Sequence, residues 1–596
     1  MGTAPPCREH AIIGEQRNGH KGLNHPSFVG CRCLFRMRVI QTVISRTAGE
    51  LHAGDGAAPS PGAIYPATVG GQPAYPWTIL RTARAAAAIA GLAVIGAYVS
   101  IALARLGYPG HLEILEENSL VEVNRILAGQ QLYPAPSASF VPDDYTPLYF
   151  AVSAGAASLL GQSYVALRLV SLVASLICFA ILGRLVHGET GSRGAGMAAA
   201  GLLAATYFAV DTWFDVARVD SLFLALSVAG LYAARRARRT RGAVAAGLLL
   251  GAAFCTKQSA LVESAAVFAA LAAGPRRQLA AVAAAAWTAV VGGSTLALGL
   301  ASHGWYVYYV FEQVSQHALS PSSASQFWVS DLLPTLGIAI CAVLLGARRM
   351  PLVLLAGSAA LAVEAFVARS ETGSNLNDLL PVYLMIAMLA GLAMGGRPTL
   401  LPRAAGRFAR PPWLARFAQW RRGAGRRWIP VVVGGLVLVQ IGVLAGGFRL
   451  SQAFPPDADR IAGQRLVTAA RALGGTVAIP AAPAIAIMAG RQPAEDQVAA
   501  ADVLHSSDQS AKTIFATSLA QAVAAQKFSG IITEFAHDLR GFPADLSRYY
   551  HRCPQTPLDG VSSVPFSANA RAFPVSVWLP IGHGPSCAVV VRMLES

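Results

Sequence analysis

Apolar stretches of about 20 residues recur between residues 84 and 447, and this repetition constrains the fold more than any other feature of the chain. A helix needs about 20 apolar residues to cross the hydrocarbon core of a bilayer. Hydrophobic residues make up 54% of the chain and charged residues 13%, whereas a soluble domain carries roughly 25% charged residues. The sequence therefore predicts an all-α polytopic membrane protein.

The arginines orient the predicted spans, because arginine and lysine collect in the cytoplasmic loops of membrane proteins. The loop 396–428 contains nine arginines and no acidic residue, which places it inside. Eleven spans satisfy the rule, at about 84–106, 167–186, 195–212, 220–234, 242–256, 259–273, 279–301, 331–347, 351–367, 378–395 and 429–447. The net charge of +16 follows from this topology, so we reject a nucleic-acid-binding role. The short apolar stretch 147–161 is interpreted as a helix at the membrane surface.

The remaining parts of the chain flank this membrane domain, which we place at 81–448. Residues 1–80 lack the uninterrupted apolar core of a signal peptide and are expected to form a disordered cytoplasmic tail. Residues 449–596 alternate helical patterns with strand-like stretches such as "TVAIPA" and "GIITEF", which predicts a small extracytoplasmic α/β domain. A disulfide between Cys553 and Cys587 is compatible with that location.

Acidic residues of the membrane region concentrate on the predicted outer side. They are Glu113, Glu116, Glu117, Glu122, Asp143, Asp144, Asp211, Asp215, Asp220 and Asp331. Acids contribute little to orientation, so topology does not explain this asymmetry. Ionisable groups at membrane level are costly and mark functional sites. The sequence therefore predicts a polar cavity that opens to the exterior.

Glu116 and Glu117 are the first candidates for chemistry. A carboxylate in a cavity acts as general base on an incoming hydroxyl or amine. Adjacent helical residues point about 100° apart, so usually one of the two faces a given site. The alternative is that both acids complement the dipole at the start of a helix.

Basic side chains on the same side are candidates for binding a phosphate. Arg218, in "FDVARVDS", either holds a phosphate bidentately or pairs with Asp215 or Asp220. Lys257 is the lone lysine of the membrane domain and either neutralises a phosphate or extends to the interface. Each residue therefore has a binding interpretation and a structural one.

Two loops add further candidates for substrate contacts. Asn375 and Asn377, in "RSETGSNLNDLLP", either approach a ligand or cap a helix. Asp144 and Tyr145, in "DDYTPLYF", are expected above the cavity, before a helix that begins at Pro147. The aromatic residues of "GWYVYY" and "QFWVSD" are better explained as an interfacial belt.

The order of these features resembles the GT-C superfamily of membrane glycosyltransferases. The resemblance covers about residues 84–395 and is greatest to a bacterial group with aminoarabinose transferases, protein O-mannosyltransferases and lipopolysaccharide galacturonosyltransferases. The segments that carry it are "EENSLVEVNRILAGQQLYP", "YTPLYF", "ALRLVSLV", "DVARVDSLFLAL" and "GLLLGAAFCTKQSAL". Each segment alone is weak evidence for the family, whereas the order of the segments along the chain is more specific evidence.

The resemblance implies a role for individual residues. In that family an acid of the first outer loop is the base, and the family's acid pair falls on Glu116 and Glu117. The family usually has Asp at the first position, so the choice between Glu116 and Glu117 stays open. Glu122 matches a recurrent acid of the same helix, and Thr146 replaces a proline of the family motif. The candidates for the donor phosphate are Lys257, Arg168 and Arg218.

The sequence thus predicts an inverting glycosyltransferase of the bacterial inner membrane, with its site and C-terminal domain outside the cytoplasm. The donor is a polyprenyl-phosphate sugar, and the acceptor is a hydroxyl or amine of a lipid, a polysaccharide or a protein. A transporter or flippase for a lipid-linked sugar is the alternative, but the paired halves typical of secondary transporters are not found. A scaffold subunit is a third reading. The sequence identifies no particular cofactor, and the outer acids are compatible with a divalent metal ion although no spacing demands one.

Overall fold

The computed structural model describes residues 76–346, 350–395, 425–533, 539–554, 556–558, 573–582 and 584–595. All of these lie in one compact unit. The predicted tail up to residue 75 and most of the arginine-rich loop, 396–424, fall outside the described residues. Helix α2 begins at Pro76, a few residues before the predicted start of the membrane domain.

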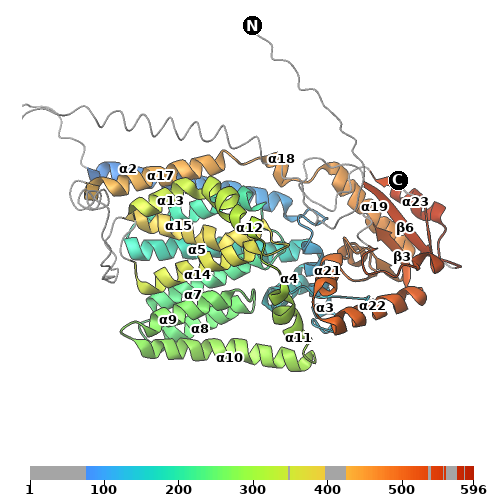
Figure 1. The fold of residues 1–596 in the computed structure, drawn as a ribbon. Helices are drawn as coiled ribbons and strands as arrows, with labels where there is room; N and C mark the ends of the chain where they lie inside the picture. Colours follow the sequence, from blue (N-terminus) through green and yellow to red (C-terminus); the bar gives the residue numbers. More distant parts are fainter. Residues whose placement is uncertain are drawn as a thin grey trace, which may run out of the picture. The chain divides into compact units, whose positions relative to one another are not determined.

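A helix occupies every place at which the sequence predicts a span (Figure 1). These helices are α2 (Pro76–Leu106), α5 (Tyr164–Thr190), α6 (Arg193–Ala205), α7 (Asp220–Arg236), α8 (Thr240–Phe254), α9 (Ala260–Ala272), α10 (Arg277–Ala301), α13 (Leu333–Gly346), α14 (Leu352–Ser370), α15 (Leu380–Gly395) and α17 (Gly425–Ala445). The all-α membrane class is therefore confirmed.

The described residues contain seven stretches long and apolar enough to cross a membrane. Helices α6, α7, α8 and α9 are not among them, because they have 13, 17, 15 and 13 residues. At 1.5 Å per residue these helices measure about 20 to 26 Å, less than the hydrocarbon core of roughly 30 Å. The count of eleven spans stays a prediction.

Small residues allow the membrane helices to approach closely. A Cβ atom added at Gly201 of α6 would overlap the backbone of Gly91 on α2, and one added at Gly247 of α8 would overlap the carbonyl of Ala283 on α10. Small residues at helix interfaces are typical of membrane bundles, in which van der Waals contact drives association. The many glycines and alanines of the sequence therefore have a structural use.

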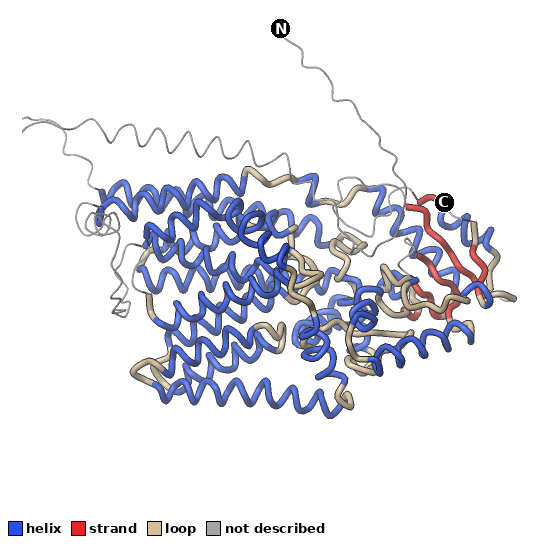
Figure 2. The backbone as a smooth tube through the Cα atoms, in the orientation of Figure 1, coloured by secondary structure: helices blue, strands red, loops and turns tan. Residues whose placement is uncertain are grey.

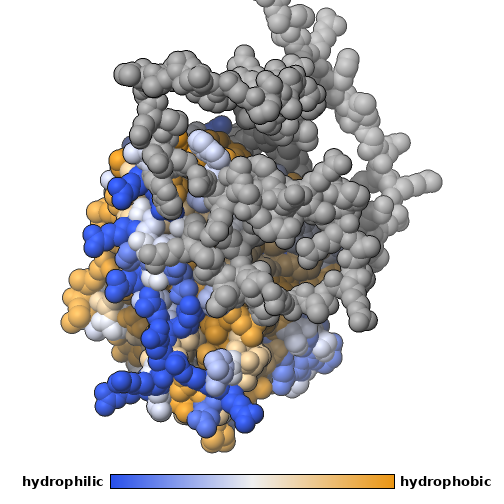
Figure 3. All heavy atoms as spheres, turned by 90° about the vertical axis from the view of Figure 1, so that its left-hand side faces the viewer, coloured by the Kyte–Doolittle hydropathy of each residue, from blue (hydrophilic) through white to orange (hydrophobic). Residues whose placement is uncertain are grey.

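Exposed arginines gather at the helix ends that the sequence predicts to be cytoplasmic. They are Arg184, Arg193, Arg236, Arg238, Arg239, Arg241, Arg276 and Arg277. Figure 3 faces the end of the bundle at which α2 and α10 begin and shows a strip of hydrophilic residues among hydrophobic ones. This distribution agrees with the positive-inside rule.

Shorter helices connect the membrane helices at their opposite ends. Helix α3 (Glu116–Leu127) follows α2, and α4 (Leu148–Leu160) precedes α5. The π-helix η2 (Tyr308–Gln313) and the short helix α11 (Trp305–Val307) follow α10. Before α13 come α12 (Pro321–Gln326) and the π-helix η4 (Phe327–Leu332), and before α15 comes η5 (Leu376–Leu379). Most candidate site residues belong to these connections.

The C-terminal part contains the predicted α/β domain, whose sheet is red in Figure 2. Its helices include α19 (Asp457–Leu473), α20 (Ala484–Met488), α21 (Gln497–His505), α22 (Gln509–Ala524) and α23 (Cys587–Glu595). The strands are β1 (Thr476–Ala478), β2 (Gln492–Pro493), β3 (Phe528–Thr533), β4 (Tyr550–Arg552), β5 (Thr556–Leu558) and β6 (Phe573–Pro580). Their order is β2-β1-β3-β6-β4, with β5 also paired to β6.

The sheet changes from parallel to antiparallel pairing at β3. Strand β1 pairs in parallel with β2 and β3, whereas β6 pairs antiparallel with β3 so that Ile531 lies opposite Trp578. Cys553 and Cys587 form a disulfide with a Cα–Cα distance of 5.4 Å, which joins the segment after β4 to α23. The bridge that the sequence left open is therefore present.

Candidate active site

Glu116 is fully buried, and each of its carboxylate oxygens accepts two hydrogen bonds. Arg168 donates from Nε over 2.9 Å and from Nη2 over 2.6 Å. The backbone N–H groups of Leu112 and Ala217 donate over 2.5 and 2.6 Å. Burial by itself would raise the pKa of Glu116, but the Arg168 guanidinium and these hydrogen bonds hold it below its ordinary value. Glu116 is therefore ionised and anchored.

Glu117, the next residue, is held by three different elements. Its Oε1 accepts a 2.6 Å hydrogen bond from the Tyr164 hydroxyl of α5 and lies 2.6 Å from Nδ1 of His111. Its Oε2 accepts a 2.9 Å hydrogen bond from the backbone N–H of Ala484, the first residue of α20. Glu117 thus joins α3 both to the membrane domain and to the C-terminal domain.

Asp143 lies at the centre of a second polar group, which we call the outer cluster: Asn118, Glu122, Asp143, Asp144 and Arg218. Asn118 donates from Nδ2 to Oδ1 of Asp143 over 2.8 Å, and Arg218 donates from Nη1 to Oδ2 over 3.2 Å. The backbone N–H of Asp143 donates to Oε1 of Glu122 over 2.9 Å. Two helix turns of α3 and the loop before α4 are therefore joined here.

The guanidinium of Arg218 is buried but only partly used. Its Nη1 donates hydrogen bonds to Asp143 and to the carbonyl of Leu115, while Nε and Nη2 have no hydrogen-bond partner among the described residues. The rings of Tyr145 and Trp213 lie 4.8 and 6.0 Å from its Cζ atom. A buried guanidinium with two unpartnered nitrogens, which carry three N–H groups, is suited to an anion such as a phosphate.

Asp144 and Glu113 are the least constrained carboxylates of this region. Both are only partly buried. No described residue donates a hydrogen bond to the carboxylate of Asp144, and Glu113 accepts one from the backbone N–H of Leu115. Burial and the neighbouring Asp143 raise the pKa of Asp144, and burial raises that of Glu113 to about 8. With a pKa of about 8, Glu113 gains and loses a proton near neutral pH.

Lys257 is committed to acidic partners. Its Nζ lies 3.1 Å from Oδ1 of Asp220 and 3.4 Å from Oδ1 of Asp378. Asn377 donates from Nδ2 to the same Asp220 oxygen over 3.2 Å. Asn375 caps η5 in a reciprocal capping box with Asp378, as the structural interpretation of that loop expects. The structure therefore brings the start of α7, the segment between α8 and α9, and η5 together around Asp220.

Two further predicted residues lie in ion pairs that leave little capacity for a ligand. Arg168 donates to Glu116 and to the carbonyls of Tyr108 and Gly110. Asp215 accepts a 2.8 Å hydrogen bond from Nε of Arg105 and one of 2.9 Å from the Tyr207 hydroxyl. Arg168 and Asp215 thus support the fold of the outer loops.

Sequence reasoning missed several polar residues that the structure reveals. Arg105 and Asn118 pair with acids distant in the chain, which no local pattern shows. Glu263 on α9 and Glu364 on α14 are buried inside predicted spans, where Ser259 donates to Glu364 over 2.6 Å. An acid within an apolar stretch is the signal that would have found these two.

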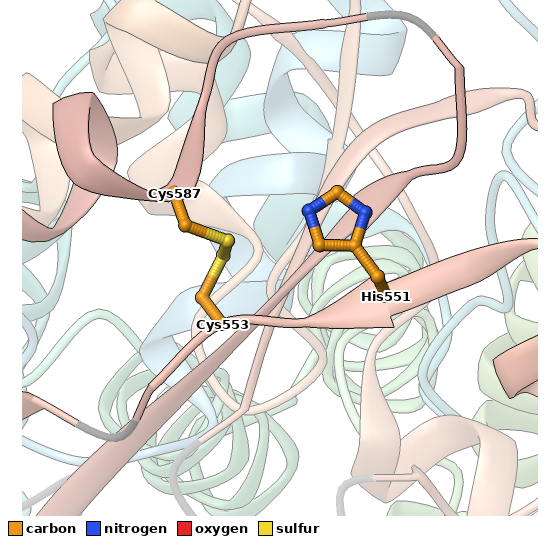
Figure 4. Close-up of side chains that lie close together, drawn as sticks. All are labelled: His551, Cys553 and Cys587. Atoms are coloured by element: carbon orange, nitrogen blue, oxygen red, sulfur yellow. A yellow bond between two sulfur atoms is a disulfide. The ribbon is translucent and has the colours of Figure 1, made fainter.

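His551, Cys553 and Cys587 form the group of potential metal ligands that the described residues contain (Figure 4). The two sulfurs are joined in the disulfide, so they are not available as thiolate ligands. His551 is exposed beside them. The group therefore supports the structure of the C-terminal domain, and no metal chemistry is assigned to it.

The comparisons with known proteins agree with this architecture. Residues 144–306 match the family model described as dolichyl-phosphate-mannose-protein mannosyltransferase. The chain is similar to the crystal structure of ArnT from Cupriavidus metallidurans bound to undecaprenyl phosphate, with a TM-score of 0.53, 12% identity, and coverage of 83% of this chain and 99% of ArnT. The apo structure of that ArnT gives a TM-score of 0.53 and 12% identity, with coverage of 82% of this chain and 97% of ArnT. No curated protein matches the sequence.

At 12% identity the structural match shows the fold, and the family model independently matches the segment from the loop before α4 to α11. That segment contains Asp144, Arg168, Arg218 and Lys257. The resemblance expected from the sequence is therefore confirmed. The chain therefore has the fold of ArnT, and the partial match to the mannosyltransferase family model adds to its likeness to membrane glycosyltransferases of the GT-C type.

Proposed function

We propose that the protein moves a sugar from a polyprenyl-phosphate carrier to a hydroxyl or amine acceptor, with inversion, on the extracytoplasmic side of a bacterial inner membrane. The observation that carries this proposal is the outer cluster, in which the open N–H groups of Arg218 lie beside the carboxylates of Asp143 and Asp144. An anion-binding group next to a proton-accepting group is what transfer from a phosphate requires. The undecaprenyl phosphate bound to the similar ArnT supports this donor class.

Arg218 is our candidate for the donor phosphate. The sequence also offers Lys257 and Arg168 as candidates for the phosphate, but each already donates hydrogen bonds to carboxylates or carbonyls. Of these three residues, Arg218 is the one with nitrogen atoms, Nε and Nη2, that make no hydrogen bond in the described part of the chain. Its charge would stabilise the phosphate as the bond between the anomeric carbon and the phosphate oxygen breaks and that oxygen keeps the electron pair.

Two assignments compete for the general base. The sequence assigns it to Glu116 or Glu117, and that assignment stays a prediction. The hydrogen bonds favour Asp144, because its carboxylate has free lone pairs and a raised pKa, whereas the pKa of Glu116 is lowered. The base takes the proton of the acceptor while the acceptor oxygen or nitrogen attacks the anomeric carbon from the face opposite the phosphate.

The disulfide supports an extracytoplasmic C-terminal domain. Disulfides persist in oxidising compartments such as the bacterial periplasm and are rare in the cytosol. Cys553 and Cys587 are bridged, whereas the described cysteines of the membrane helices, Cys178, Cys255 and Cys341, are free. The proposed site and this domain would then lie on the same side of the membrane as the outer cluster.

Donor consumption in membranes tests the proposal. Wild type, Glu116→Gln, Glu117→Gln, Asp144→Asn and Arg218→Lys are expressed at equal abundance, and polyprenyl-phosphate sugars are measured by mass spectrometry. Asp211→Asn is the control, because Asp211 is exposed and Asn tolerates its positive φ of 46°. Depletion of one donor species by wild type and the control supports the transferase.

The same experiment separates the alternatives. Loss of depletion in Asp144→Asn but not in the two Glu variants identifies Asp144 as the base, and the reverse identifies Glu116 or Glu117. If wild type leaves every donor untouched, the transferase proposal fails and a transporter or scaffold role takes its place.

A further inference from the structure

The backbone around Asp144 is held in place, although its carboxylate accepts no hydrogen bond from the described residues. On one side, the N–H of Asp143 donates to Oε1 of Glu122 over 2.9 Å. On the other side, the Tyr133 hydroxyl donates to the carbonyl of Tyr145 over 2.8 Å. The segment before α4 therefore follows a fixed course, and the side chain of Asp144 is the part left open.

The turn between α8 and α9, residues 255–259, lies against this segment. The N–H of Leu148 donates to the carbonyl of Cys255 over 2.8 Å, and the Thr146 hydroxyl donates to the carbonyl of Phe254 over 2.8 Å. Both contacts join positions that are far apart in the sequence. The segment before α4 is thus tied to the end of α8.

Gln258, in the same turn, holds the peptide group of Asp144 itself. Its Nε2 donates to the carbonyl of Asp144 over 2.7 Å and makes a longer contact of 3.4 Å with the carbonyl of Val310 in η2. A carbonyl oxygen only accepts hydrogen bonds, so both neighbours require the amide nitrogen, and not the amide oxygen, at this place. Gln258 therefore connects the turn after α8, the segment before α4, and η2.

The position of its backbone decides what the Asp144 carboxylate can reach. A general base works within about 2.6–3.2 Å of the proton that it takes, and a displacement of about 1 Å can cost on the order of 100-fold in rate. An aspartate side chain is short, so a shift of its peptide group moves the carboxylate with it. With no described side chain bonded to that carboxylate, the hydrogen bonds of the backbone are what position it.

We propose that Gln258 is a positioning residue for sugar transfer, whose amide holds the peptide carbonyl of Asp144 and so keeps the free carboxylate within reach of the acceptor. The inference rests on the proposed function and on the assignment of the base to Asp144. Gln258 acts on turnover through Asp144 and without contact to the substrate. The preceding residue, Lys257, is paired with Asp220 and Asp378, so neighbouring residues of one turn have separate tasks.

Gln258→Met tests this role, because methionine has a similar length and volume but no N–H donor. The depletion of polyprenyl-phosphate sugars in membranes, normalised to folded protein, is expected to fall about tenfold. Gln131→Met is the matched control: Gln131 also donates from Nε2 to a backbone carbonyl, that of Ala301 over 2.7 Å, but it is exposed. The control should consume donor at the wild-type rate.

A double-mutant cycle separates positioning from a general structural role. If Gln258 acts through Asp144, Gln258→Met should cause no further loss in a protein that already carries Asp144→Asn. A merely structural role would cause the same tenfold loss in both backgrounds. Long incubations make the residual turnover of Asp144→Asn measurable.

Hydrogen exchange provides a readout that needs no turnover. Deuterium uptake by peptides that cover residues 143–148 is measured by mass spectrometry on the full-length protein in detergent. Uptake should rise in Gln258→Met and not in Gln131→Met, because the segment opens more often when one of its hydrogen bonds is removed.

Each outcome decides the inference. Unchanged exchange in Gln258→Met, wild-type turnover in that variant, equal losses in both backgrounds, or a fully active Asp144→Asn overturns it. If wild type consumes no donor, the proposed function fails and this role fails with it. Consumption by wild type together with equal losses in both backgrounds defeats the inference alone and leaves the proposed function standing.

Discussion

Glu116 and Asp144 lie in neighbouring acidic groups, but their carboxylates are used in opposite ways. Glu116 accepts four hydrogen bonds and is ion-paired to Arg168 at 2.6 Å. Asp144 accepts none from the described residues and is partly exposed. A carboxylate whose lone pairs are all occupied holds structure, whereas one with free lone pairs and a raised pKa is ready for proton transfer. Within one acidic region, the hydrogen bonds thus give Glu116 a structural role and leave Asp144 as the candidate for proton transfer.

The largest expected effect is the loss of stability when the ion pair between Glu116 and Arg168 is broken. Glu116→Gln removes one charge of a buried ion pair and leaves Arg168 uncompensated, so the protein should lose about 3–5 kcal/mol of stability. Thermal unfolding in detergent measures this loss, with the exposed Glu312→Gln as control. A variant as stable as the control would mean that the pair is not an anchor.

The second effect concerns phosphate binding. Arg218→Lys keeps the positive charge but removes the planar fork, so donor turnover should fall roughly 100-fold with little change in stability. Donor consumption at equal protein abundance measures it, and the exposed Arg548→Lys is the control. Wild-type turnover in Arg218→Lys would show that the open N–H groups of Arg218 are not used for the donor.

The third effect is a dependence of stability on pH. Burial raises the pKa values of Glu495 and Asp502 to about 8 and that of Asp496 to about 7. Because these values exceed the roughly 4 expected in the unfolded chain, the folded state binds more protons and stability falls as pH rises from about 4 to 8. Melting temperatures across this range should decrease, and less steeply in Asp502→Asn. A melting temperature that rises with pH would contradict the assigned acids.

Much of the fold could be predicted from the sequence because apolar length and arginine placement are local signals. Both located the two ends of α5 and α10 within a few residues, and they located the end of α2 at Leu106 but not its start at Pro76. The short helices α6 to α9 were also located, but their lengths depend on neighbours that pack beside them. The sheet of the C-terminal domain was expected only as strand-like stretches, since the pairing of β3 with β6 joins distant segments.

The sequence predicted which acidic residues lie in the region of the candidate site, but it did not predict their hydrogen-bond partners. Sorting acids by side found Glu116, Asp144 and Asp220 together, but it gave no means of telling a paired carboxylate from a free one. The partners come from distant positions, such as Arg168 for Glu116. The contribution of Ala484 is a backbone N–H group, which carries no sequence signal at all.

The measurement that tests the central claim most directly is donor consumption by Asp144→Asn beside Glu116→Gln, each normalised to the folded protein present. The account predicts that Asp144→Asn is folded like wild type and loses at least 100-fold in turnover, as expected for a missing general base. Glu116→Gln should lose folded protein but retain turnover per folded molecule. A fully active Asp144→Asn together with a folded, inactive Glu116→Gln would contradict the account and return the base to Glu116.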